Sequence, residues 1–213
     1  MSEGLFISLE GIDGSGKTTL IQYLQDKLAT YPLLRIREPG GTAISEKIRE
    51  LLLNIDNYLI TARTEAILYA AARSQVVEQL IKPALDEGKL VLADRYVDST
   101  MAYQGYGRGL DLQFLFTLNQ LCTSGLLPDA TILLDITPQV GEKRRKHEEA
   151  DRLEQEGREF QARVREGYLQ LALKEPKRFY VVNANREFRH VAEDAWGQIM
   201  SLLIKRGWLP GEN

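Results

Sequence analysis

Hydrophobic residues along this chain follow two alternating patterns. Short runs that are almost entirely apolar recur through the sequence, and polar or turn-forming residues bound each of them. Such runs are typical of strands in a parallel sheet covered on both faces, because neither face of the strand contacts water. The runs predict five strands, at 5–9, 33–37, 90–94, 130–135 and 179–182.

Between these runs, apolar residues recur at intervals of three and four, which is the spacing of an amphipathic helix. This spacing predicts helices over 17–29, 43–53, 64–85, 111–122, 160–171 and 191–204. Thr137 followed by Pro138 predicts a further helix start, since proline is favoured at the first helical position. Strands alternating with helices, without a linker or repeat, predict one three-layer α/β/α domain over residues 1–213, with a mainly parallel five-stranded sheet.

The first predicted strand leads directly into a glycine-rich loop and then a helix. This loop has the pattern G-x-x-x-x-G-K-T, which in this context is a phosphate-binding P-loop. Glycines allow backbone N–H groups close to a phosphate, the helix N-terminus favours negative charge, and the lysine adds a positive charge. Chance alone would give the bare pattern in on the order of one chain in a hundred. The residues predicted to hold a nucleoside triphosphate are Gly11, Ile12, Asp13, Gly14, Ser15, Gly16, Lys17, Thr18 and Thr19.

Composition narrows the range of partners and compartments. A formal net charge of −3 gives no overall attraction to nucleic acid or to an anionic membrane. No apolar stretch approaches the roughly 20 residues of a membrane span, and the N-terminus lacks the basic segment of a signal peptide. The single cysteine, Cys122, cannot form an internal disulfide. We therefore expect a cytoplasmic protein with no nucleic-acid or membrane partner.

The end of the third predicted strand indicates which kind of P-loop protein this is. The chain has neither the switch and base-recognition motifs of a GTPase nor the signature loop of a transport ATPase. Its third strand instead ends in Asp94-Arg95, at the sheet edge where ligands of α/β proteins bind. Asp94 and the Thr18 hydroxyl are candidate magnesium ligands, while Arg95 can reach a phosphate. The alternative is a structural ion pair at a strand end.

Five motifs together resemble one family. They are LEGIDGSGKTT, REPGGT, LYAAAR, DRYVDSTMAYQGYGRG and DRLEQE, and they occur in this order along the chain. The set resembles the bacterial thymidylate kinases from end to end, and it is far more specific than a P-loop alone. The resemblance implies a P-loop nucleoside monophosphate kinase fold and transfer of the γ-phosphoryl of ATP to dTMP, giving dTDP and ADP. It also implies Mg²⁺ as cofactor and a homodimer.

For the reaction, the resemblance implies cations around the transferred phosphoryl, because two polyanions must approach each other. Lys17 and Arg95 match this role, and Asp13 matches an acidic position that organises metal and water. A charged segment at about 141–159 resembles the mobile lid of the family, in the type whose P-loop lacks an arginine. The candidate lid cations are Arg144, Arg145 and Arg152.

The lid departs from arginine-rich versions, since His147-Glu148-Glu149 occupies a stretch where another arginine can occur. Which lid cation contacts the phosphates therefore stays open. The alternative is a solvated helix face, the usual role of a run of charges.

For dTMP, the resemblance implies a complete set of contacts. Tyr69 matches an aromatic shelf for thymine, and Tyr103 matches the residue that crowds the 2′ position. Packing in the core is the alternative for both rings. Three side chains match positions that bind the base, namely Arg73, Thr100 and Gln104. Arg95 matches the clamp on the acceptor phosphate, and Glu38 and Arg49 match positions near the sugar and phosphate.

Two further functions stay open at this point. One is a kinase for another pyrimidine nucleotide, nucleoside monophosphate or deoxynucleoside. The other is a catalytically silent regulator that binds nucleotide; the presence of Lys17, Arg95 and the lid cations favours turnover over this second alternative.

Overall fold

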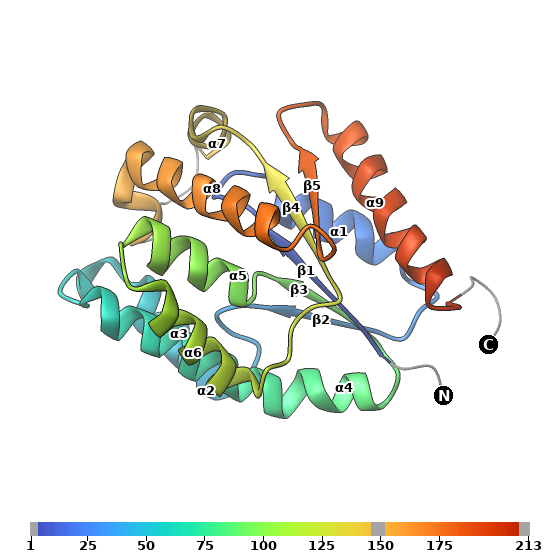
Figure 1. The fold of residues 1–213 in the computed structure, drawn as a ribbon, viewed down its shortest axis with the longest axis horizontal. Coiled ribbons are helices and arrows are strands. Elements are labelled where there is room, and N and C mark those ends of the chain that lie inside the picture. Colours follow the sequence, from blue (N-terminus) through green and yellow to red (C-terminus); the bar gives the residue numbers. More distant parts are fainter. Residues whose placement is uncertain (1–3, 146–151, 209–213) are drawn as a thin grey trace.

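The chain forms one five-stranded parallel sheet. A computed structural model describes residues 4–145 and 152–208 (Figure 1). The strands are β1 (Leu5–Glu10), β2 (Leu33–Arg37), β3 (Leu90–Asp94), β4 (Ala130–Asp135) and β5 (Phe179–Asn183). They lie in the order β2-β3-β1-β4-β5, and every neighbouring pair is parallel. The prediction of five strands is confirmed. The sheet was predicted to be mainly parallel, and among the described residues it is wholly parallel.

Helices cover both faces of this sheet, which confirms the three-layer prediction (Figure 1). In Figure 1, α1 and α9 lie on one side, and α2, α3, α4 and α6 lie on the other. The bounds are α1 (Lys17–Lys27), α2 (Ala43–Leu53), α3 (Ala62–Val76), α4 (Lys82–Asp86), α5 (Val97–Thr100), α6 (Leu112–Thr123), α7 (Pro138–Arg144), α8 (Gly157–Lys174) and α9 (Phe188–Lys205). Among these described residues, no helix is both long and apolar enough to cross a membrane.

Strand β1 illustrates why its sequence is apolar throughout. Successive side chains of a strand point to opposite faces of the sheet. Leu5, Ile7 and Leu9 belong to the hydrophobic core that includes α1 and α9. Phe6 belongs to the core on the other face, where it meets the helical run around Val76. Both faces are buried, so the alternation of a half-exposed strand is absent.

Side chains cap several helices at the positions where a polar turn gives way to the helical spacing of apolar residues. Thr42 accepts a hydrogen bond from the backbone N–H of Ser45 at the start of α2, and Asp111 does the same for Phe114 at the start of α6. Pro138 is the first residue of α7, as predicted, although the Thr137 side chain before it makes no capping bond. These caps satisfy N–H groups that the helix itself leaves without partners.

Two helical segments differ from the prediction. The run predicted at 64–85 is α3 and α4 joined by a π-helical stretch at Val77–Ile81. The segment after β3 was not predicted to be helical, yet it forms α5 and a second π-helical stretch, Met101–Gly107. Its glycines hide the helical pattern. A Cβ at Gly107 would lie 2.7 Å from the Phe160 ring, so glycine here allows α8 to approach closely.

Candidate active site

The carboxyl ends of β1, β2 and β3 open into one cavity of about 420 Å³. Most of the residues predicted from sequence line it: Asp13, Gly14, Ser15, Gly16, Lys17, Thr18, Thr19, Glu38, Arg49, Tyr69, Arg73, Asp94, Arg95, Thr100, Tyr103, Gln104, Arg144 and Arg145. The fold therefore brings together positions from the whole first two thirds of the chain. Lining residues that sequence reasoning missed are Arg37, Pro39, Leu53, Ser99 and Leu153.

The P-loop backbone adopts conformations that favour glycine. Gly11, Gly14 and Gly16 have φ angles of 145°, 76° and 93°. A Cβ at Gly14 would lie 2.4 Å from the carbonyl oxygen of Gly141, in α7. Helix α7 therefore lies directly against the P-loop, and this contact places the end of α7 beside the cavity.

Lys17 is held by the loop that it follows. Its Nζ donates to the carbonyl oxygens of Gly11 and Ile12, at 2.9 and 3.1 Å, and to Ser15 Oγ at 3.3 Å. Burial, reinforced by the positive charge of Arg95, lowers the pKa of Lys17 to about 8. The carbonyl partners are uncharged, so a phosphate would be a stronger partner for this ammonium group.

Arg95 and Asp13 form the central ion pair of the cavity. Arg95 has a φ of 70°, which is rare outside glycine, and its backbone N–H donates to Leu9 O at 3.0 Å. Its Nη2 pairs with Asp13 Oδ1, and its Nη1 donates to Gly11 O at 3.0 Å. Burial alone would raise the pKa of Asp13, but the charges of Arg95 and Lys17 hold it below its ordinary value. Asp13 is therefore an anion that orients Arg95.

Tyr103 joins this pair. Its hydroxyl donates to Asp13 Oδ2 at 3.0 Å and accepts from Arg95 Nη2 at 3.0 Å, while its ring lies 4.8 Å from the Arg95 guanidinium. Gln161, from α8, donates to the same Asp13 oxygen at 2.9 Å. The ring is 5% exposed, so Tyr103 both packs in the core and borders the cavity.

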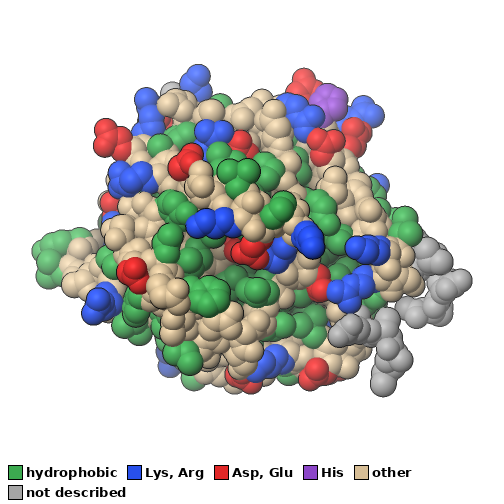
Figure 2. All heavy atoms as spheres, viewed as in Figure 1, with side chains coloured by type: hydrophobic (Ala, Val, Ile, Leu, Met, Phe, Trp, Pro, Cys, Tyr) green, Lys and Arg blue, Asp and Glu red, His purple; other side chains and the backbone are tan. Residues whose placement is uncertain are grey.

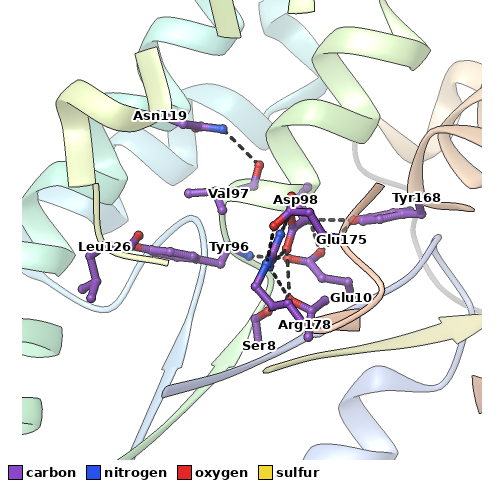
Figure 3. A network of polar contacts seen from close by, with 12 residues as sticks. Ser8, Glu10, Tyr96, Val97, Asp98, Asn119, Leu126, Tyr168, Glu175 and Arg178 are labelled. Carbon is purple, nitrogen blue, oxygen red and sulfur yellow. Dashed lines mark hydrogen bonds and ion pairs between the residues drawn. The ribbon is translucent and has the colours of Figure 1, made fainter. Parts of the chain in front are cut away.

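Glu10 is a buried part of this arrangement that the sequence analysis did not single out. It ends β1, is fully buried, and accepts hydrogen bonds from Tyr96 N at 2.7 Å and Tyr168 OH at 2.8 Å (Figure 3). It also accepts one from Ser99 Oγ at 2.7 Å. Burial, with a contribution from the nearby Asp98, raises its pKa to about 7. Both hydroxyl groups also accept from Arg95 Nη1. The sequence offered one indication of Glu10, namely a charged residue at the end of an apolar run just before the P-loop.

Arg73 organises the opposite end of the cavity. Its side chain is 1% exposed and donates to Glu38 Oε2 at 2.7 Å. Its other partners are Thr100 Oγ1 and Asn119 Oδ1, each at 2.9 Å, and the carbonyl oxygen of Tyr96 at 3.1 Å. These contacts use four of the five N–H donors of a guanidinium. Burial raises the pKa of Glu38 despite the charge of Arg73.

The remaining candidates border the same space. Tyr69 is half-buried on α3, four residues before Arg73, and so lies on the same helix face. Arg49, on α2, donates to Pro39 O at 2.9 Å. Thr18 is exposed in the first turn of α1, and Asp94 is half-buried at the end of β3. These two supply the oxygen atoms that magnesium prefers.

The three predicted lid cations separate in the structure. Arg144 donates to Ala184 O at 2.9 Å, and both Arg144 and Arg145 line the cavity. Arg152 is buried elsewhere: its Nη2 donates to Glu65 Oε2 at 2.6 Å and its Nε to Leu52 O at 2.9 Å. Residues 146–151, with His147-Glu148-Glu149, lie outside the described residues.

This combination, in which a P-loop, the cations Lys17 and Arg95 and the buried polar cluster around Arg73 share one cavity on a wholly parallel sheet, is typical of a P-loop kinase of the nucleoside monophosphate class. A family model described as thymidylate kinase matches residues 9–195. The chain belongs to the thymidylate kinase family.

Individual relatives agree over nearly the full length. The thymidylate kinase of Thermoanaerobacter sp. (strain X514) is 50% identical over 194 residues, covering 90% of this chain and 95% of the relative. That of Desulforudis audaxviator is 47% identical over 214 residues, covering 98% and 97%. The crystal structure of thymidylate kinase from Ehrlichia chaffeensis superposes with a TM-score of 0.74 at 32% identity, covering 92% of this chain and 98% of the other.

Proposed function

We propose that this protein transfers the γ-phosphoryl of ATP to the 5′-phosphate of dTMP, giving dTDP and ADP. The observation that carries the proposal is that Lys17 and Arg95, beside the P-loop, line the same cavity as Tyr69 and Arg73. Nearly full-length relatives described as thymidylate kinases support the choice of dTMP and ATP.

The phosphate end acts by positioning and by electrostatic stabilisation. Lys17 exchanges its carbonyl partners for oxygens of the β- and γ-phosphates, and Arg95 bridges the acceptor phosphate and the transferred group. Asp13 acts as an orienting anion and does not need to remove a proton, because a phosphate monoester is already substantially ionised at pH 7. Arg144 and Arg145 are the lid cations, whereas the contacts of Arg152 favour a structural role.

Thr18 and Asp94 would hold Mg²⁺ together with phosphate oxygens. A hydroxyl and one carboxylate fit this ion, which is commonly bound by few protein ligands and by substrate phosphates. The ion would neutralise charge on the β- and γ-phosphates.

The base end reads thymine. Tyr69 stacks on the ring, and the Arg73 guanidinium, which lines the same cavity, bonds a base carbonyl. Thr100 and Gln104 complete the base contacts. Tyr103 crowds the 2′ position and so favours deoxyribose. Glu38 and Arg49 contact the sugar and phosphate. Glu38 Oε1 is buried and has no hydrogen-bond partner among the described residues, which fits an acceptor for a hydroxyl group of the substrate.

We further propose a homodimer in the cytoplasm. The neighbouring helices α2, α3 and α6 carry exposed apolar side chains, namely Ile44, Leu51, Ile67, Phe116 and Leu121. Figure 2 also shows hydrophobic side chains at the tip where α2 leads into α3. An exposed apolar surface of this kind is typical of an interface. Sedimentation equilibrium at micromolar concentration tests it, and a monomer would contradict it. The single thiol suits a reducing compartment.

The decisive experiment is a coupled assay of ADP release from MgATP, with dTMP, dUMP, dCMP, dGMP, AMP and thymidine as separate acceptors. Strong stimulation by dTMP is the expected result. Stimulation by another acceptor alone would retain phosphoryl transfer but overturn the assignment of the base pocket. No stimulation by any acceptor would favour a regulator that binds nucleotide.

A further inference from the structure

A buried carboxylate outside the cavity lining connects three parts of the chain. Glu65, on α3, is fully buried. Its Oε1 accepts from Gln104 Nε2 at 2.9 Å and from Arg108 Nε at 3.2 Å. Its Oε2 accepts from Arg108 Nη2 at 3.2 Å and from Arg152 Nη2 at 2.6 Å. Glu65 therefore joins α3, the π-helical stretch after α5 and the residues that follow position 151.

These contacts determine which way the Gln104 amide faces. A side-chain amide has an NH₂ group at one end and a carbonyl oxygen at the other, and it can turn over to suit its neighbours. A carboxylate only accepts hydrogen bonds, so Glu65 requires the NH₂ group of Gln104. Gln104 is 2% exposed and lines the cavity. With its NH₂ group held at Glu65, the oxygen is the acceptor that this amide offers a ligand there.

The carboxylate itself cannot turn away. Arg108 contacts both of its oxygens, and Arg152 is anchored in turn by its Nε–H to Leu52 O at 2.9 Å. Arg108 also pairs with Glu156. Both guanidinium groups point donors at Glu65, so each oxygen must stay an acceptor.

We propose that Glu65 is a positioning residue that sets base specificity by fixing Gln104 with its carbonyl oxygen toward the base. This inference rests on the proposed function. An acceptor at this position matches the N3–H of thymine or uracil, whereas cytosine carries an acceptor at N3. Wrong pairing would leave two acceptors facing each other in a buried site, which disfavours cytosine strongly.

The variant Glu65→Gln tests this directly. Its carbonyl oxygen should stay with the Nη2 atoms of Arg152 and Arg108, which donate to Oε2. Its NH₂ group should then take the place of Oε1, where it loses the Arg108 Nε contact and faces Gln104. Gln104 would then turn over and present its own NH₂ group to the base. We expect kcat/KM for dTMP and dUMP to fall together by about 10- to 100-fold, while kcat/KM for dCMP falls little or rises. The readout is the ratio of kcat/KM for dCMP to that for dTMP, because a merely structural defect would lower kcat/KM for all acceptors alike.

An exchange of the two residues supplies the rescue. Gln104→Glu alone places two carboxylates together and should lose dTMP turnover. In the double variant Glu65→Gln/Gln104→Glu, the NH₂ group of residue 65 pairs with one carboxylate oxygen, and the other oxygen again offers an acceptor to the base. The wild-type preference for dTMP over dCMP should return to within about 10-fold. If Glu65→Gln alone is too unstable to assay, the comparison of the double variant with Gln104→Glu still tests the inference, because the acceptor preference should return only in the double variant.

Glu78→Gln is the matched control, since Glu78 is an exposed carboxylate whose partner is Lys82. It should leave the acceptor ratio unchanged. An unchanged ratio in Glu65→Gln, or a double variant whose loss equals the product of the single losses, would overturn the inference. Failure of the wild-type enzyme to use dTMP would instead overturn the proposed function, so the two failures are distinguishable.

Discussion

The two ends of the cavity hold their arginines differently. The Arg73 side chain is 1% exposed and donates to four fixed oxygen atoms, from Glu38, Thr100, Asn119 and Tyr96. The Arg95 side chain is 17% exposed, and one of its partners is a carbonyl oxygen of the P-loop. The proposed base end is thus held by fixed protein contacts, whereas the proposed phosphate end is held by contacts that phosphates can replace. A rigid pocket suits recognition, and exchangeable cations suit a charge that moves during the reaction.

The largest effect should come from removing the cation between the substrates. Arg95→Ala should lower kcat by about 10³-fold or more, with ATP affinity retained within a few-fold, because Arg95 acts on the transferred group. Rapid-quench kinetics and ATP titration measure the two quantities. Arg35→Ala, on an exposed arginine of β2, is the control. Unchanged turnover in Arg95→Ala would exclude its bridging role.

At the base end, the main effect should be on stability. Arg73→Met leaves Glu38 buried without its ionic partner and should lower the free energy of unfolding by about 3–5 kcal/mol. Urea denaturation measures it. Adding Glu38→Gln should recover part of the loss. An Arg73→Met variant as stable as the wild type would mean that the Arg73–Glu38 pair does not hold this end of the cavity.

Glu10 should give the phosphate end a pH-dependent stability. Its folded pKa of about 7 lies above the ordinary value of 4.5, so the folded state retains a proton that the unfolded state releases. Its contribution is complete below pH 4.5 and is lost as pH rises through 7. Relative to Glu10→Gln, which mimics the protonated acid, the wild type should lose about 2–3 kcal/mol between pH 5 and pH 8. The free energy of unfolding of both proteins is measured by urea denaturation at each pH. A difference between the two proteins that stays constant from pH 5 to pH 8 would contradict the prediction.

The smallest effect should come from the aromatic shelf. Tyr69→Ala should weaken dTMP binding by about 1–3 kcal/mol, the range measured for base–aromatic stacking. Tyr69→Phe keeps the ring and should bind dTMP nearly as the wild type does. Isothermal titration with dTMP measures both. An unaltered dissociation constant in Tyr69→Ala would mean that the ring only packs in the core.

Local sequence predicted the strands and the P-loop because each depends on nearby residues alone. The runs at 33–37, 90–94 and 130–135 match the observed strands at both ends. The helical segment after β3 escaped prediction, because its glycines resemble a loop until Phe160 of α8 lies against them. Burial outside the segment decided its conformation.

The motifs also located most of the cavity, since residues at strand ends and in glycine-rich loops meet at one edge of a parallel sheet. They did not reveal Glu10 or Glu65. Each lies within an apolar pattern of its strand or helix, and its role depends on partners about 40 to 160 residues away. Charge alone did not separate Arg144 and Arg145, which line the cavity, from Arg152, which is tied to Glu65.

The sequence by itself determined that this chain carries a P-loop at the end of its first strand, in a parallel sheet covered by helices. That information is local, because strand, glycine turn and helix adjoin one another along the chain. Only the tertiary structure decided which side chains hold the others in place. Hydrogen-bond partners such as Glu65 and Gln104 are fixed by how distant helices pack, and packing is a property of the whole fold.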